Sequence, residues 1–423
     1  MLVRDYLKKA LYDTQKGYFS RSSPIMMNEG KQVTNFSKLQ GKNDWIKVQS
    51  ELFQSKQGSG EWLTQCELFA PHFSSVLVDY VYRKHPGAQQ GLNVIEIGGG
   101  SGTNALHFLD SLKERYPDVY SRSKYTLCEI SPTMASLQLS RVSGRHQDVV
   151  KVHNADFLDW NSPVEEPTII IAMEVLDNLP HDKLTYTGSG GSLPAFSEAD
   201  LNSWREIVVE EWGMEKARPL ADALTIETAK LFLSESKEEG SSTSILKNMM
   251  NNMKRTLSQF SRTRAEKNAK SVFIPSGSVK LLKALEGYFP HHLLIAGDFS
   301  YLPFGDVEGS SKNLRLPGSL FGCKNAPIVS GVNSQTGQRQ DFPSYILQGQ
   351  NVDVFFQTDF GRLAKAYTTT VTGGSAEVKT TYRFLDENVS NEDRMMTTTI
   401  AGYNPMLEDF ENVSFLLAER AFR

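Results

Sequence analysis

The sequence predicts an α/β protein in which a doubly wound sheet follows an N-terminal helical lobe and carries a helical insertion. Three observations predict this class. An apolar strand at residues 92–97 breaks directly into a glycine turn and a helix. Strand-like and helical segments then alternate along the chain. Residues 168–173 form a continuous apolar run rich in β-branched side chains, which is typical of a strand buried on both faces of a parallel sheet.

The glycine turn after the first strand indicates a nucleotide-cofactor site. Gly98, Gly100 and Gly102 allow the backbone to turn sharply and to approach a ligand closely. The apolar residues after Thr103 have helical spacing, so the ligand would lie near a helix N-terminus. A dinucleotide fingerprint would need a glycine at position 103, where this chain has Thr103. The G-x-G-x-G spacing, with Glu96 two residues before it, instead resembles motif I of class I S-adenosylmethionine (SAM) methyltransferases. A glycine triplet in a surface turn is the plain alternative.

The next two strands supply acids in register with the glycine turn. Residues 124–130 predict a second strand that ends in an acid and completes a βαβ unit with the helix before it. Glu129 would accept hydrogen bonds from ribose hydroxyls. A third strand is expected at residues 150–157, where Asp156 would bind the adenine amino group and Phe157 would flank the ring. A helix or turn cap is the alternative for Asp156 taken alone.

Several acidic and amide side chains follow the fourth strand. Ligands of open α/β sheets bind outside the carboxyl ends of the strands, so these side chains would stand over the methyl group of the cofactor. One or two solvated acids are common in a loop, whereas four acidic or amide residues here fall within nine positions. Glu174 and Asp177 are the candidates for catalysis. Asn178 and His181 are weaker ones, because a lone histidine is more often structural.

Segments spread along the whole chain carry a family resemblance. They are the opening Arg4–Asp13 with Lys16–Phe19, the glycine turn, the acidic loop at 174–180, and residues 298–303, 358–360 and 404–407. Together they resemble the MidA-like family of mitochondrial SAM-dependent protein arginine methyltransferases. The resemblance implies symmetric dimethylation of an arginine on a nascent subunit of respiratory complex I, in support of complex I assembly in the mitochondrial matrix.

An arginine acceptor would give the two catalytic candidates a defined role. Methyl transfer from a sulfonium is an in-line displacement, so the enzyme mainly aligns the nucleophile and tunes the local charge. A guanidinium nitrogen is a poor nucleophile while its charge is delocalised, and a carboxylate that binds the other nitrogens would orient it. We expect Glu174 and Asp177 to do this. Glu174 could instead contact the cofactor, which would leave Asp177 to the acceptor.

Composition agrees with such an enzyme and disfavours other classes. The chain has 423 residues with 45 basic and 49 acidic side chains, a balance that predicts no nucleic-acid surface. Cys66, Cys128 and Cys323 are odd in number and far apart, which argues against a disulfide framework or a thiolate zinc site. The sequence contains no run of about 18 apolar residues, so no transmembrane helix is predicted. The first residues already match the family, so either a presequence is missing from this chain or the protein is not mitochondrial. The family resemblance favours a missing presequence.

The chain is expected to consist of a helical lobe over residues 1–90, which covers the cofactor, and a SAM-methyltransferase domain over residues 91–423. An insertion at about 185–290 has helical patterns at 217–233 and 245–270. Residues 305–350 are expected to form a long surface or substrate-facing loop. Strands are expected again at 292–296, 352–358 and 413–418.

Three functions are compatible with these features. The first is a SAM-dependent protein arginine methyltransferase. The second is a methyltransferase with another protein or a small molecule as its acceptor, and the third is a mitochondrial assembly chaperone that keeps the fold without the catalysis. The glycine turn, Glu129 and the acidic loop favour an active cofactor site, but they do not separate the first two functions.

Overall fold

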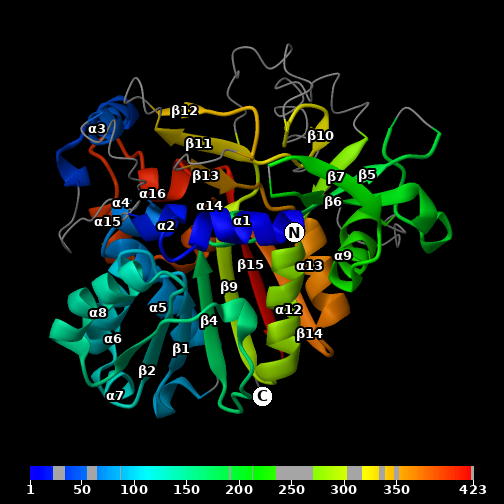
Figure 1. The fold of residues 1–423 in the computed structure, drawn as a ribbon. Helices are drawn as coiled ribbons and strands as arrows, with labels where there is room; N and C mark the ends of the chain where they lie inside the picture. The colour runs from blue at the N-terminus through cyan, green and yellow to red at the C-terminus, as the bar shows by residue number, and fades with distance from the viewer. Residues whose placement is uncertain are drawn as a thin grey trace, which may run out of the picture.

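The structure of the protein is a computed structural model, in which the described residues form three sheets flanked by helices (Figure 1). The expected helix at 245–270 lies outside the described residues except for its last position. The structure describes residues 1–21, 34–54, 64–85, 87–189, 192–211, 213–234, 270–302, 317–332, 339–346 and 352–420.

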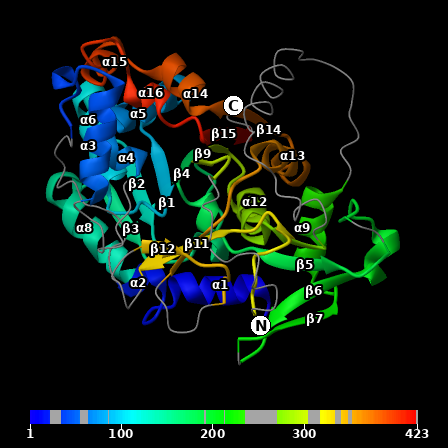
Figure 2. The same cartoon turned by 90° about the horizontal axis from the view of Figure 1, so that it is seen from above.

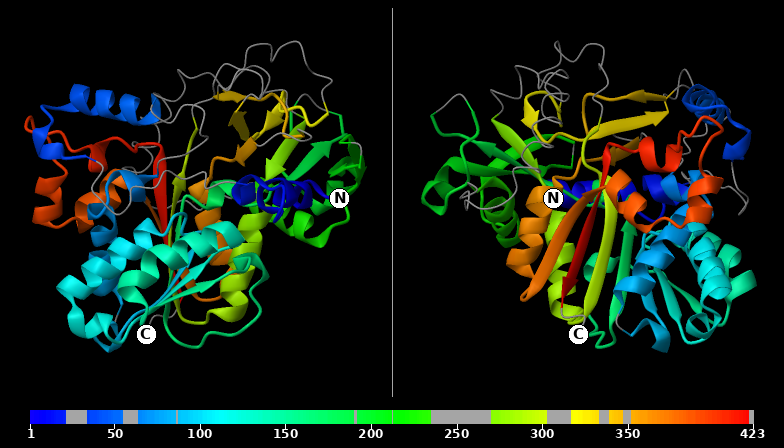
Figure 3. Two further views of the ribbon diagram at one scale, coloured as in Figure 1. Left: turned by 60° about the vertical axis from the view of Figure 1, so that its left-hand side comes forward. Right: turned by 180° about the vertical axis from the view of Figure 1, so that it is seen from behind.

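A seven-stranded sheet forms the centre of the described fold and confirms the predicted doubly wound class. Strands β1, β2, β3, β4 and β9 pair in parallel, whereas β15 runs antiparallel to both of its neighbours. Figure 3 shows this antiparallel strand beside the sheet edge. In spatial order the strands are β14 (Gly374–Thr380), β15 (Val413–Arg420), β9 (His292–Phe299), β4 (Thr168–Met173), β1 (Asn93–Ile97), β2 (Lys124–Cys128) and β3 (Val150–His153).

The strand order reverses between β1 and β4. From β1 the chain moves outward through β2 to β3, and it then returns to β4 on the other side of β1. Ligands of doubly wound sheets bind in the crevice at such a switch point, outside the carboxyl ends of the strands. The topology therefore predicts a binding site beside the glycine turn.

Alternating side chains of the buried strands build two cores, one on each face of the sheet. Figure 2 shows helices on both sides of the sheet. In β4, Ile169 and Ile171 pack into one core, and Ile170 and Ala172 pack into the other. This two-sided burial explains the unbroken apolar run in the sequence. The first core contains residues of α5 (His72–Lys84), α6 (Thr103–Arg115), α7 (Pro117–Tyr120) and α8 (Pro132–His146). The second core contains residues of α12 (Ser276–Tyr288), α13 (Phe360–Thr370) and α9 (Ala223–Leu233).

The described part of the insertion contains the helices α9 and α12 together with strands that the sequence did not indicate. These strands form an antiparallel sheet with one short parallel edge strand. The run from Trp204 to Val209 has buried side chains at nearly every position, so it lacks the alternation that marks a half-exposed strand. The sheet order is β10 (Cys323–Lys324), β8 (Ser271–Ile274), β5 (Asp182–Tyr186), β6 (Trp204–Val209) and β7 (Glu215–Pro219).

Two other expected segments also need correction. The helix expected at 217–233 begins only at Ala223, where Asp222 accepts a hydrogen bond from the backbone of Thr225 and so caps it. The segment expected to be a long loop contains β10 and two strands of a third, antiparallel sheet. That sheet has the order β12 (Arg339–Asp341), β11 (Ile328–Val332) and β13 (Val352–Phe355).

The helices of residues 1–90 are shared between two parts of the fold. α1 (Val3–Tyr12) buries Val3, Leu7 and Leu11 in a core with β6, β8 and β13, and Figure 1 shows it crossing above the central strands. α5 instead packs on α6 against the main sheet. The remaining described helices of this region are α2 (Tyr18–Arg21), α3 (Lys42–Gln54) and α4 (Gln65–Leu68); near the C-terminus lie α14 (Thr381–Asn388), α15 (Asn391–Met396) and α16 (Pro405–Glu408).

Candidate active site

A pocket opens at the carboxyl ends of β1, β2 and β4, beside the switch point of the sheet. α1 and α2 close it from above, and the start of α8 and one side of α12 contribute to its walls. Most of its surface is apolar, with a few acidic and amide groups. The lining residues are Lys8, Tyr12, Phe19, Ile97, Gly98, Gly100, Cys128, Glu129, Ile130, Met134, Ala155, Asp156, Phe157, Leu158, Glu174, Val175, Asn178, Leu179, Pro180 and Leu281.

The glycine turn forms one wall of this pocket. Gly98 and Gly100 line it with φ angles of 62° and 53°, which is the left-handed region that residues with a Cβ rarely adopt. A Cβ on Gly98 would also lie 3.1 Å from Val175 Cγ2. Gly102, with φ of 83°, sits at the N-cap of α6 outside the pocket lining and turns the chain into the helix. The turn therefore presents bare backbone to any ligand.

Glu96 lies in β1 just before the glycine turn, and it does not line the pocket. Its carboxylate accepts one hydrogen bond from Asn104 Nδ2 and another from the Tyr125 hydroxyl, each at 2.8 Å. Burial raises the pKa of Glu96 to about 7, although these two donors oppose the shift. The acid that precedes the glycines is thus tied to α6 and β2 by its side chain.

The two acids predicted for the adenosine part line the pocket at the ends of neighbouring strands. Glu129 accepts hydrogen bonds from Ser131 N at 2.8 Å and from Gln138 Nε2 at 2.9 Å. Burial raises the pKa of Glu129 to about 7. Asp156 accepts from Leu158 N and pairs with Lys8 Nζ at 2.7 Å. Asp156 is therefore both a turn cap and a pocket residue.

Phe157 forms the apolar floor beside these acids. Its ring is 3% exposed and stacks on Phe289, with ring centroids 5.6 Å apart. This packing fixes the ring at the position where a flat base could lie against it.

Glu174 and Asp177 follow the carboxyl end of β4, where Asp177 is buried and Glu174 is half-buried. Glu174 lines the pocket, has a left-handed φ of 53° and accepts a hydrogen bond from Gln65 N at 3.1 Å. Burial raises the pKa of Glu174 to about 8, and Asp298 adds to the shift. Asp177 is 6% exposed, and among the described residues its Oδ1 has no hydrogen-bond partner. Burial, followed by the charge of Asp298, raises the pKa of Asp177 well above its usual range.

Two further acids near Asp177 were not among the predicted site residues. Asp298, at the end of β9, accepts the backbone N–H of Asp177 at 3.1 Å, and burial raises the pKa of Asp298 to about 7. Asp353 of β13 accepts from Asn178 Nδ2 at 3.0 Å. The family resemblance at 298–303 was a signal for the first. β13 reaches the site only through tertiary folding, so no local pattern marks Asp353.

The N-terminal helix supplies pocket residues that sequence reasoning also missed. Lys8 and Tyr12 of α1 and Phe19 of α2 all line the pocket, and the Tyr12 hydroxyl donates to the backbone oxygen of Asn178 at 3.3 Å. Burial, with the charge of Asp177 next in weight, raises the pKa of Tyr12 well above its usual range. The family resemblance of the opening segment was the one signal that could have indicated these residues.

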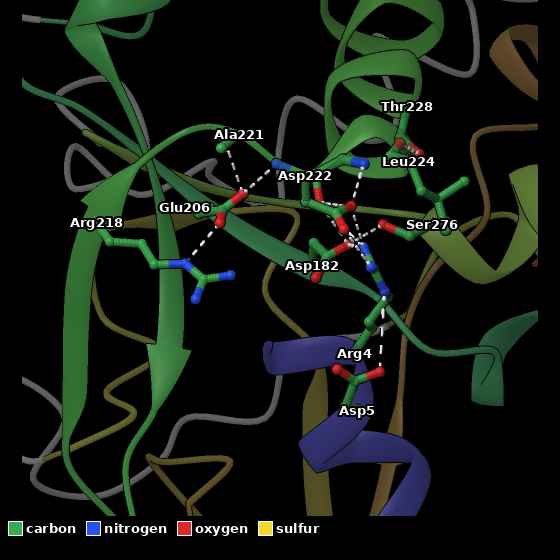
Figure 4. Close-up of polar contacts among 11 residues, drawn as sticks. Arg4, Asp5, Asp182, Glu206, Arg218, Ala221, Asp222, Leu224, Thr228 and Ser276 are labelled. Carbon is green, nitrogen blue, oxygen red and sulfur yellow. Dashed lines mark hydrogen bonds and ion pairs between the residues drawn. The ribbon is translucent and has the colours of Figure 1, made fainter. Parts of the chain in front are cut away.

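An ionic network holds α1 in this position (Figure 4). The Arg4 guanidinium donates to Asp182 at 2.6 Å and binds both oxygens of Asp222, at 2.7 and 2.8 Å. Asp182 belongs to the acidic stretch after β4, and its side chain is 1% exposed. Ser276 Oγ donates to the same Asp182 oxygen at 2.5 Å. This acid therefore anchors the helix that covers the pocket.

His181 makes contacts typical of a structural histidine, the role that is more common for a lone histidine. Its Nδ1 lies 2.8 Å from the backbone oxygen of Leu179, and its ring stacks on Phe356 with centroids 3.7 Å apart. Burial lowers the pKa of His181 to about 4, so the ring is neutral at physiological pH.

The described residues contain neither a helix long and apolar enough to cross a bilayer nor a group of three metal-ligating side chains. The three cysteines are buried and free.

The residues of the pocket fit SAM. The left-handed glycines offer backbone without side chains, which a nucleoside with a charged tail can approach closely. Acids end two adjacent strands at the positions suited to a ribose and to an adenine amino group, beside an aromatic ring. The carboxyl groups at the end of β4 suit a sulfonium and a cationic acceptor, whose positive charge would favour their ionised forms.

Comparison with known proteins agrees with this geometry. Residues 76–374 match a family model described as "Putative S-adenosyl-L-methionine-dependent methyltransferase". The chain is 22% identical over 369 residues to the mitochondrial protein arginine methyltransferase NDUFAF7 homolog of Schizosaccharomyces pombe, covering 84% of this chain and 73% of that protein.

Solved structures share the fold. One is a crystal structure of a Burkholderia thailandensis protein bound to S-adenosyl-homocysteine; it has a TM-score of 0.56 and 13% identity, and the match covers 100% of this chain and 88% of that one. A second crystal structure from the same organism has a TM-score of 0.53 and 12% identity, and the match covers 100% and 87% of the two chains.

Proposed function

The chain belongs to the family of SAM-dependent methyltransferases whose model matches its residues 76–374, and on this premise we propose that it methylates arginine side chains of mitochondrial proteins. The arginine acceptor and the mitochondrial setting are supported by the fission-yeast relative, whose name carries both. The resemblance of the N-terminal and acidic-loop segments to the MidA-like family supports a finer proposal. In it, the acceptor is a subunit of respiratory complex I and the enzyme works in the matrix.

One observation carries the arginine proposal: two carboxyl groups, three positions apart just after β4, have no cationic partner among the described residues. Neither Glu174 nor Asp177 has an ion pair with any described lysine, arginine or histidine, and Asp177 Oδ1 has no hydrogen-bond partner there. Buried charges are normally paired, because an unpaired one costs several kcal/mol. A guanidinium group would supply both the missing charge and the missing donors.

The same acids would prepare the acceptor for reaction. A planar guanidinium offers five N–H donors, so carboxylates at two positions can hold two of its nitrogens and leave the third facing the pocket. Glu174 lines the pocket, whereas Asp177 lies behind it, next to Asp298. With their raised pKa values, these carboxyls can also take up the proton that the methylated nitrogen releases.

The remaining pocket residues would bind the cofactor and keep water out. SAM supplies a methyl group activated by the positive charge of its sulfonium. Glu129 would hold the ribose, Asp156 and Phe157 would hold the adenine, and Gly98 and Gly100 would allow the close approach. Tyr12 and Phe19 cover the pocket, which excludes solvent from the reacting atoms.

The direct test is to incubate the purified protein with SAM that carries a labelled methyl group and with mitochondrial protein extract. Protein hydrolysates are then analysed by mass spectrometry for methylated amino acids. We expect labelled methylarginine that is absent when SAM is replaced by S-adenosylhomocysteine. Label on lysine, or label only on small molecules, would contradict the arginine proposal. Binding of SAM without any transfer would indicate an assembly factor that does not catalyse.

A further inference from the structure

The short helix α4 (Gln65–Leu68) places two buried polar side chains next to the glycine turn without satisfying them. Gln65 is 1% exposed and Glu67 is 2% exposed. Among the described residues, neither polar atom of the Gln65 carboxamide has a hydrogen-bond partner, and neither has Glu67 Oε2. Each such atom normally costs about 1–3 kcal/mol, so three within three residues need an explanation.

α4 lies behind one end of the cofactor pocket, and its side chains are not among the lining residues. The backbone N–H of Gln65 donates to Glu174, which lines the pocket. Glu67 Oε1 accepts hydrogen bonds from the hydroxyls of Ser101 and Thr103, the residues that flank Gly102 at the start of α6, and it lies 3.8 Å from Arg141 Nη1. Burial raises the pKa of the Cys66 thiol between them, and the charges of Glu174, Glu96 and Glu67 add to that shift. α4 thus lies against both the glycine turn and the end of β4.

The order of the pocket residues indicates which part of a cofactor would reach this end. Asp156 and Phe157 suit the adenine, and Glu129 on the neighbouring strand suits the ribose. The pocket then continues past Gly98 and Gly100 to Glu174, which α4 contacts. In SAM the group beyond the ribose and the sulfur is an amino acid that carries an ammonium and a carboxylate.

The unpartnered atoms match these two charges. The free carboxylate oxygen of Glu67 can accept a hydrogen bond from the ammonium. The Gln65 amide nitrogen can donate to the carboxylate, and its oxygen can accept a second bond from the ammonium. We infer that Gln65 and Glu67 bind the amino-acid end of SAM and select for cofactors that carry it. This inference rests on the SAM site of the proposed function and is independent of the methyl acceptor.

The test compares two ligands that share the adenosine and the thioether. S-adenosylhomocysteine carries the amino-acid end, whereas 5′-methylthioadenosine lacks it. Titration calorimetry on the full chain should show that Gln65→Leu and Glu67→Gln each weaken S-adenosylhomocysteine at least about 10-fold. Both variants should bind 5′-methylthioadenosine within about two-fold of the wild type. Gln147→Leu, at an exposed position at the far end of α8, is the matched control and should change neither affinity.

Stability of the ligand-free protein separates a binding role from a structural one. Replacing an unpartnered buried amide by an apolar group of similar size should leave the melting temperature of Gln65→Leu unchanged or higher. Glu67→Gln keeps an oxygen for the Ser101 and Thr103 hydroxyls, so it tests the charge with the local hydrogen bonds intact. Equal losses for both ligands, or no loss for either, would overturn the inference. Wild-type binding of S-adenosylhomocysteine without arginine methylation would leave it standing and refute only the proposed acceptor.

Discussion

Removing Arg4 should both destabilise the protein and loosen the cover of the cofactor pocket. Arg4 is 15% exposed and makes three charge-assisted hydrogen bonds to two acids from other parts of the chain. Asp182 is nearly inaccessible, and its burial raises its pKa even beside the guanidinium; the more exposed Asp222 has a lowered pKa, chiefly because Arg4 donates to it. The loss of Arg4 would therefore leave the buried carboxylate of Asp182 without a cation, at a higher cost than for the more exposed Asp222.

The expected loss of stability follows from the unpaired, buried charge of Asp182. Breaking a buried ion pair by removing one partner costs about 3–5 kcal/mol. Asp182 would keep hydrogen bonds from Ser276 and Thr225, so we expect the lower end of that range for Arg4→Met, about 3 kcal/mol. The surface pair of Arg145 with Asp110 provides a matched control, because Arg145 is 54% exposed and Arg145→Met should cost less than about 1 kcal/mol.

The assay is urea unfolding monitored by tryptophan fluorescence, with affinity for S-adenosylhomocysteine measured on the folded variants. Arg4→Met should also weaken that affinity, because Lys8 and Tyr12 of the released helix line the pocket. The double variant Arg4→Met with Asp182→Asn should recover part of the stability, since it removes the buried charge at Asp182 and leaves only the more exposed Asp222 without its cation. A cost for Arg4→Met as small as that of the Arg145 control would refute this account of the network.

Two further predictions concern the pocket itself. Gly100→Val should abolish binding of S-adenosylhomocysteine in calorimetry, because φ of 53° is strained for a β-branched residue and its side chain would enter the pocket; normal affinity would remove the glycine turn from the site. The kcat/KM for the arginine acceptor should rise with pH up to about 8, since only ionised Glu174 can pair with a guanidinium and burial raises its pKa to about 8. Glu174→Gln should reduce this rise and leave the part that Asp177 contributes, and an unchanged profile would exclude Glu174 as a source.

The residues that line the candidate cofactor pocket at the ends of the strands could be located from sequence because their signals are local. The strand, the turn and the helix that hold Gly98 and Gly100 are contiguous, and Glu129 and Asp156 each end a strand that the apolar pattern reveals. Parallel pairing then brings these strand ends to one edge of the sheet. The exception is Glu96, whose motif indicates the cofactor although its side chain bonds Asn104 and Tyr125.

The acceptor half and the cover were less predictable because they depend on contacts between distant segments. Asp353 reaches Asn178 across 175 positions, and Arg4 reaches Asp182 across 178. No periodicity in a single segment encodes such a pairing. The strands of the insertion were missed for a related reason, since β6 is buried on both sides and so lacks the alternation that marks a half-exposed strand.

The most direct test of the central claim is a comparison of binding and transfer in Asp177→Asn. Asparagine keeps the size of the side chain but removes the charge that we assign to the guanidinium. Asp177 does not line the pocket, so we predict that the variant binds S-adenosylhomocysteine with wild-type affinity. Its rate of methylarginine formation should fall at least about 100-fold, as expected when a buried charged hydrogen bond to the acceptor is lost. Transfer at the wild-type rate would contradict the claim that this acid holds the acceptor.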